Sequence, residues 1–257
     1  KAALLNAESL TTDVSKRLVL LHPNGDQLPS NTQHWLSMWP VKEHHHIRWD
    51  TQADFERLAR FLSGQAIGLV FSGGGARGLA HFGVYLALKE AGIPIDMVGG
   101  TSMGGMIAAQ CAANYDIQTF LKLNKQAEQT KPFKKYTLPI FSLIDGHQFD
   151  VNLKKGFGNI HIEDLWMPFF CVSSNLSTSE LQVHKQGLVW KALRATAAIP
   201  GMLQPVVDKG HLLVDGGVIN NLPGDVMKQF CNKVIVVDVG SEADLSMNED
   251  DEEMPSP

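Results

Sequence analysis

A serine set between glycines, in the stretch Gly100-Thr101-Ser102-Met103-Gly104, constrains the fold of this chain more than any other feature. It has the G-x-S-x-G spacing of a nucleophile elbow, in which a strand turns sharply into a helix and exposes the serine hydroxyl. Gly100 and Gly104 allow that turn because they carry no Cβ that would clash. A short apolar strand around 97–98 and a helix of small residues over 106–113 are predicted on either side. Ser102 is therefore the candidate nucleophile, with the N–H groups of that helix directed at it.

A glycine-rich loop, residues 73–78, follows an apolar strand at 67–71 and precedes a helical pattern over 79–91. Its G-x-G-x-x-G spacing is also typical of dinucleotide-binding folds. Such a site needs an acidic residue at the carboxyl end of the second strand, whereas Asp96 lies before that strand. The backbone N–H groups of the loop can equally stabilise negative charge on a substrate carbonyl. The candidate oxyanion-hole residues are Gly73, Gly74, Gly75, Ala76, Arg77 and Gly78.

An aspartate at the end of the apolar stretch 212–215, Asp215, is the candidate partner of the serine. In an ordinary triad on this type of sheet a histidine would follow the acid, and no histidine follows Asp215 in the sequence. This favours a dyad in which Asp215 acts directly on Ser102. Because an unperturbed aspartate has a pKa of about 3.9, the dyad needs apolar surroundings that raise this pKa. An aspartate before two glycines is as typical of an ordinary turn, and that alternative stays open.

Three motifs, GGGARG at 73–78, GTSMG at 100–104 and DGG at 215–217, resemble in order and spacing those of the patatin-like phospholipase family. The resemblance extends to 193–205 and 220–223, and the flanking sequence is similar to the neuropathy target esterase-like subgroup. It covers roughly residues 15–240. The resemblance implies a Ser102–Asp215 dyad, an oxyanion hole from the glycine loop, and hydrolysis of acyl esters in lysophospholipids or phospholipids. No cofactor and no metal are expected.

The order of apolar strands and helical patterns predicts an α/β fold: a three-layer α/β/α domain with a mostly parallel central sheet. The apolar stretch 233–239 is predicted to be a strand of that sheet covered on both faces. Two other functions stay open. One is a nucleotide-binding module that uses the glycine-rich loop. The other is a lipid-binding or acyl-transfer protein on the same fold, which would pass the acyl group to an acceptor other than water.

Three parts are expected along the chain. Residues 1–60 are predicted to form an N-terminal segment packed on the main domain, with a short strand at 17–21 and an amphipathic helix within 50–62. Residues 61–241 are predicted to form the catalytic domain. Residues 242–257 form an acidic tail that is expected to be disordered. The apolar positions that should dock the helix are Phe55, Leu58, Ala59 and Leu62.

Histidines and an arginine outside the dyad invite other interpretations. Consecutive His44-His45-His46 could hold a metal, but neighbouring side chains point in different directions, so a solvated loop is favoured. His81 could be proposed as the missing base, and a structural role is favoured because the family pattern needs no histidine. Arg77 is ambiguous: it could assist the oxyanion loop or meet a phosphate headgroup, or it could be a plain surface arginine.

The stretch 116–145 mixes basic and aromatic side chains, a pattern typical of contact with an anionic membrane surface. A helix with a solvated lysine face explains the same residues, and neither alternative is excluded. The stretch is also the best candidate for a mobile cover over an acyl channel. The residues concerned are Phe120, Lys122, Lys125, Lys131, Phe133, Lys134, Lys135, Tyr136 and Phe141.

Composition narrows the cellular setting. A net charge of −5 argues against a nucleic-acid partner. The three cysteines are far apart and form no C-x-x-C pair, which argues against disulfides and zinc and fits a reducing compartment. No run of 18 apolar residues occurs, so a transmembrane segment is not expected. These features predict a cytoplasmic protein or one held peripherally at the cytoplasmic face of a membrane. Because the chain begins with lysine, it is expected to be a fragment that lacks an upstream regulatory region.

Overall fold

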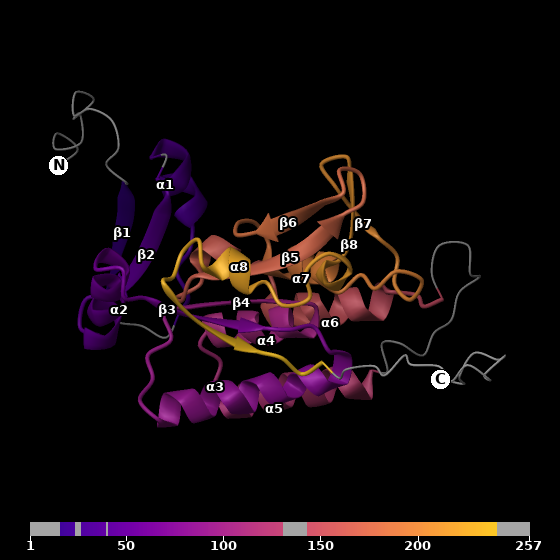
Figure 1. The fold of residues 1–257 in the computed structure, drawn as a ribbon, viewed down its shortest axis with the longest axis horizontal. Helices are drawn as coiled ribbons and strands as arrows, with labels where there is room; N and C mark the ends of the chain where they lie inside the picture. The colour runs from indigo at the N-terminus through magenta and orange to yellow at the C-terminus, as the bar shows by residue number, and fades with distance from the viewer. Residues whose placement is uncertain (1–15, 24–26, 40, 131–142, 241–257) are drawn as a thin grey trace, which may run out of the picture.

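The computed structural model describes residues 16–23, 27–39, 41–130 and 143–240 (Figure 1). The acidic tail predicted for 242–257 and residues 131–142 of the predicted membrane contact lie outside this part. Within the described residues, no helix is both long enough and apolar enough to cross a bilayer.

A seven-stranded mixed sheet forms the centre of the molecule, with strands in the order β7-β8-β5-β4-β3-β9 and β6 paired to β5. Four neighbouring strands are parallel, as predicted: β3 (Ile67–Phe71), β4 (Met97–Thr101), β5 (Phe169–Asn175) and β9 (Lys233–Val237). The antiparallel strands lie on the β5 side: β6 (Glu180–His184), β7 (Val206–Asp208) and β8 (His211–Asp215).

Apolar side chains on both faces of this sheet produce the three layers. Leu69 and Phe71 of β3 join Ile107 in one buried cluster, whereas Val70 between them joins Met227 in a cluster on the opposite face. This alternation is what a strand buried on both faces requires. The larger layer contains α3 (Ala80–Glu90), α4 (Met103–Ala112), α5 (Ile117–Gln129), α6 (His147–Phe157) and α7 (Val189–Thr196); α8 (Gly224–Met227) covers the other face.

An N-terminal unit lies beside the amino ends of the central strands, at the left of Figure 1. Its two strands pair in parallel, and its second helix is tied to the sheet by Arg60, which forms an ion pair of 2.7 Å with the fully buried Asp96. The Asp96 carboxylate also accepts the N–H of Ile67 at the start of β3. The unit consists of β1 (Arg17–His22), α1 (Thr32–Met38), β2 (Glu43–Arg48) and α2 (Gln52–Leu62).

The helix expected within 50–62 is present as α2, but the expected docking face is wrong. Phe55 and Leu62 are 41% and 62% exposed, and the buried positions are Asp54, Arg57 and Phe61. Asp54 is tolerated inside because its carboxylate forms ion pairs with Arg57 and, from β2, with Arg48. A pattern of apolar residues alone does not reveal such a charge cluster.

The strand expected at 233–239 is present as β9 and pairs in parallel with β3, but it lies at the edge of the sheet. Val236 is 50% exposed, so the expectation of two covered faces is wrong for this strand.

Candidate active site

The elbow begins where β4 ends and α4 begins, with Ser102 between them. Ser102 has φ 53° and ψ −123°, in the positive-φ region that side chains rarely adopt. A Cβ added to Gly100 would lie 2.6 Å from the carbonyl oxygen of Phe71, and one on Gly104 would meet the same oxygen. These glycines therefore let the start of α4 pack closely against the end of β3, so that Ser102 lies in the turn between β4 and α4.

Thr196 of α7 holds the elbow from the side. Its hydroxyl accepts the Ser102 N–H at 2.9 Å and donates to the carbonyl oxygen of Val172 in β5. All three groups are buried. The sequence indicated Thr196 only through its place in the stretch 193–205 (LRATAAIPGMLQP), to which the family resemblance extends.

Asp215 lies at the end of β8, directly across from Ser102. Its carboxylate accepts the Gly217 N–H at 2.7 Å. Burial raises the pKa of Asp215 above its usual value, although the Gly217 N–H and the Ser102 hydroxyl act on this pKa in the opposite direction. The carboxylate is thus a stronger base than an exposed aspartate, as the proposed dyad requires.

The glycine loop runs past the serine from β3 into the 3-10 helix η1 (Gly75–Leu79). A Cβ on Gly73 would lie 3.3 Å from the Ser102 Cβ, so loop and nucleophile are in close proximity. The Gly73 N–H donates to the backbone oxygen of Asn221, and the Asn221 side-chain amide donates to the Gly73 oxygen at 3.3 Å. Asn221, which sequence reasoning saw only as part of the NNLP motif, therefore clamps the loop on both sides of one residue.

An open depression of about 280 Å³ lies over these groups. Three of the six predicted oxyanion residues line it, namely Gly73, Gly74 and Gly75, whereas Ala76, Arg77 and Gly78, farther along η1, do not. Arg77 is exposed there. The lining residues are Gly73, Gly74, Gly75, Ser102, Ile199, Pro200, Asp215, Gly217, Val218 and Asn221.

His81 has the structural role that was favoured. Its ring is fully buried and stacks on Phe71, and its Nε2–H donates to the carbonyl oxygen of Ser72 at 2.9 Å. Burial lowers the pKa of His81, so the ring is neutral at pH 7.

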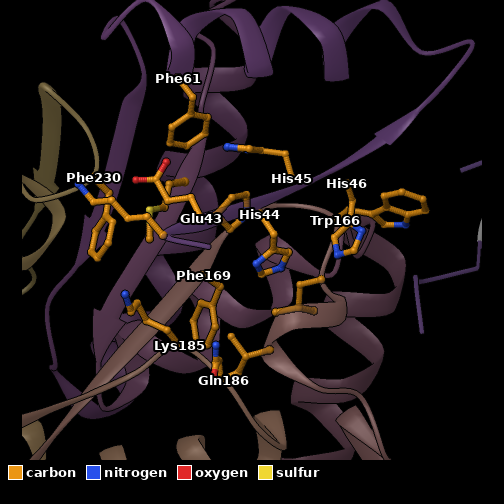
Figure 2. Close-up of a pocket in the computed structure, with 15 residues that line it drawn as sticks. Glu43, His44, His45, His46, Phe61, Trp166, Phe169, Lys185, Gln186 and Phe230 are labelled. Carbon is orange, nitrogen blue, oxygen red and sulfur yellow. The ribbon is translucent and has the colours of Figure 1, made fainter. Parts of the chain in front are cut away.

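The three consecutive histidines are not in a solvated loop, and that expectation is wrong. They belong to β2, where the Nε2–H groups of His44 and His46 both donate to the carbonyl oxygen of Glu163. His45 points to the other face of the strand, against Phe61, as Figure 2 shows. A second cavity of about 100 Å³ borders these side chains. Within the described residues, no group of three potential ligands converges as a metal site.

Comparisons with known proteins identify the family of this chain. A family model described as patatin-like phospholipase matches residues 69–227. The neuropathy target esterase sws of Drosophila melanogaster is 36% identical, covering 93% of this chain, and human patatin-like phospholipase domain-containing protein 6 is 39% identical over the same share. The lysophospholipase NTE1 of Candida glabrata is 45% identical and covers 73% of the chain. The chain spans 19%, 20% and 11% of these three relatives, respectively. This chain belongs to the patatin-like phospholipase family.

Proposed function

We propose that the protein is a serine esterase that hydrolyses acyl esters of lysophospholipids or phospholipids. The observation that carries the proposal is that Ser102 and the buried Asp215, whose pKa is raised, line the same open depression, where the Ser102 hydroxyl acts on the Asp215 carboxylate. A hydroxyl becomes a nucleophile when a base within hydrogen-bond reach can take its proton.

The reaction follows from these positions. The Ser102 oxygen bonds to the acyl carbon while its proton passes to Asp215, and the ester bond then breaks as Asp215 returns that proton to the leaving alcohol oxygen. Water attacks the acyl-serine in the second half, with Asp215 again accepting a proton, which returns to the Ser102 oxygen as the fatty acid leaves. Because Gly73 is held by Asn221, the N–H groups that we assign to the oxyanion are those of Gly74 and Gly75.

The substrate class rests on the relatives. The related NTE1 protein bears the name lysophospholipase, and lysophospholipid is accordingly the first substrate to test. The nucleotide-binding alternative gains no support from the site, because among the described residues that line the depression Asp215 is the only acidic one, and it is the proposed base of the dyad. Asp96, the acidic residue near the second strand, is paired with Arg60 at the opposite end of the sheet.

We also propose that the protein acts peripherally at the cytoplasmic face of a membrane. Cys111, Cys171 and Cys231 are buried free thiols, which suits a reducing compartment. Among the basic residues of the contact predicted for 116–145, Lys122 and Lys125 of α5 are described by the structure, and both are exposed.

Labelling with a fluorophosphonate ester tests the proposed function. Mass spectrometry should find one adduct, on Ser102, in the wild type and none in Ser102→Ala. The adduct should form far more slowly in Asp215→Asn and at the wild-type rate in Ser63→Ala, a control at the exposed end of α2. Release of fatty acid from lysophospholipid should follow the same order. Undiminished hydrolysis in Ser102→Ala would contradict the proposal.

A further inference from the structure

Large apolar side chains are exposed on three segments beside the depression. Two of these side chains, those of Ile199 and Val218, also line the depression. The two segments that carry these residues, 199–203 (IPGML) and 216–219 (GGVI), contain no charged side chain. We call the five residues the apolar rim: Leu143 (48% exposed), Ile199 (38%), Met202 (41%), Val218 (54%) and Ile219 (47%).

Backbone hydrogen bonds make the apolar rim one surface. The Asp215 N–H donates to the oxygen of Ala198 at 2.9 Å, so the turn after Ala198 and the turn after Asp215 leave the fold side by side. Ile199 follows the first residue of this pair, and the 3-10 helix η3 (Gly216–Val218) follows the second. The two halves of the rim are therefore joined directly behind the catalytic aspartate.

The third segment is joined in the same way. The Leu143 N–H donates to the Gly201 oxygen at 2.9 Å, and the Ile144 N–H donates to the Met202 oxygen at 3.0 Å. Beneath this turn, Leu203 is buried and Arg194 donates to the Gln204 oxygen at 2.9 Å. The exposed side chains thus stand on turns that are fixed from below.

Exposed apolar side chains that adjoin one another mark a surface that meets an apolar partner. The partner must suit the neighbouring depression, where a molecule with a long acyl chain has to enter. Passage of that acyl chain through water would expose its apolar surface, which is unfavourable. A rim immersed in the lipid layer removes this cost, because the chain can move from lipid to Ser102 without crossing water.

We propose that the apolar rim docks on a phospholipid surface and inserts its side chains to interfacial depth. This inference rests on the proposed function and narrows the membrane contact from the whole of 116–145 to a surface that shares only Leu143 with it. The basic residues Lys122 and Lys125 lie on α5, which Figure 1 shows at the bottom of the molecule, well apart from α7 and β8.

Another group of exposed apolar side chains provides a matched comparison. Leu21 and Leu62 are 63% and 62% exposed on the N-terminal unit, beside the amino ends of the central strands. Ser102 lies at the carboxyl end of β4, so a membrane bound at Leu21 and Leu62 would lie at the wrong end of the sheet to deliver a lipid to it. Leu21 and Leu62 are more exposed than any residue of the apolar rim. The two surfaces therefore differ in their position relative to Ser102 and not in a lack of exposed apolar side chains.

Flotation with phosphatidylcholine vesicles tests the proposal, using the full chain with Ser102→Ala so that lipid is not consumed. The double variant Met202→Asp/Ile219→Asp changes two rim residues that do not line the depression. Vesicle partitioning should fall roughly ten- to a hundredfold, since two apolar contacts are replaced by charges. The control Leu21→Asp/Leu62→Asp should partition like its parent. Roughly 0.5 M NaCl should leave binding of the parent intact, because apolar insertion is not screened.

Activity separates this proposal from the proposed function. With Ser102 present, the rim variant should cleave a short water-soluble ester at the wild-type rate but release less fatty acid from vesicle-borne lipid. Unchanged partitioning of the rim variant, loss in the Leu21/Leu62 control, or loss in salt (which would assign the contact to the α5 lysines) would each overturn the docking proposal. Absence of cleavage of the soluble ester by the wild type would instead refute the proposed function, and vesicle binding would still be measurable.

Discussion

Replacing Thr196 with valine should lower the reactivity of Ser102, although neither residue of the proposed dyad is changed. Valine has nearly the same shape but lacks the hydroxyl that accepts the Ser102 N–H and donates to the Val172 oxygen. Leaving a buried donor or acceptor without its partner costs about 1–3 kcal/mol. With two such groups affected, we expect the free energy of unfolding to fall by about 2–4 kcal/mol.

The effect on reactivity follows from the backbone of the nucleophile. Ser102 holds φ 53°, a strained conformation that costs of the order of 1–3 kcal/mol and persists only while its surroundings enforce it. Thr196 supplies one of those restraints. Its loss should slow phosphonylation of Ser102 about ten- to a hundredfold, which corresponds to about 1.4–2.7 kcal/mol of transition-state stabilisation.

Thr196→Ser is the matched control, because it keeps the hydroxyl and removes only the methyl group. It should label at close to the wild-type rate while losing about 1 kcal/mol of stability. Urea denaturation and the second-order rate of fluorophosphonate labelling give the two quantities separately. Wild-type labelling by a destabilised Thr196→Val protein would refute the reasoning, since the hydroxyl would then stabilise the fold without positioning the serine.

Three further outcomes are expected. Asp215→Asn should slow fluorophosphonate labelling about 10²–10⁴-fold. In the wild type, the labelling rate should fall on acidification with a midpoint above the ordinary aspartate pKa of about 3.9, because only the ionised carboxylate accepts the proton. A pH–rate profile of both proteins checks these two outcomes. Burial lowers the pKa of His45 to about 4 and that of His46 to about 3, so below pH 6.5 the unfolded chain binds protons that the folded chain does not. The free energy of unfolding should therefore be fully present above pH 6.5 and fall toward pH 4, by a few kcal/mol in urea titrations, and His45→Phe should flatten that slope. Asp96→Asn should cost about 3 kcal/mol in the same assay, because it leaves Arg60 without its buried partner.

Local patterns in the sequence were enough to select Ser102 and Asp215, which the structure brings to the same depression. Ser102 and Asp215 stand in short motifs whose glycines are dictated by the turns themselves, so each motif specifies its own geometry. Thr196 and Asn221 could not be found in this way. Their roles depend on hydrogen bonds to residues 94 and 148 positions away in the chain, and nothing in their own neighbourhoods records those partners.

The errors in the N-terminal unit have a related cause. Burial of polar residues there depends on partners brought from elsewhere: His44 and His46 are satisfied by one carbonyl at Glu163, and Asp54 is satisfied by Arg48 and Arg57. Polar residues are predicted to be solvated unless such partners are known. Apolar periodicity consequently placed the wrong side of α2 against the core.

Strand β5 separates the two halves of the dyad and fixes how they align. It pairs with β4 so that Val172 lies opposite Thr101, and with β8 so that Ser173 lies opposite Asp215. During synthesis the elbow leaves the ribosome long before β8 does, so a nascent chain carries the nucleophile without its base. In the proposed mechanism, hydrolysis can begin only after β8 has been added to a sheet that already contains β5. A truncated chain that ends before β8 should therefore lack the proposed base and leave Ser102 unreactive.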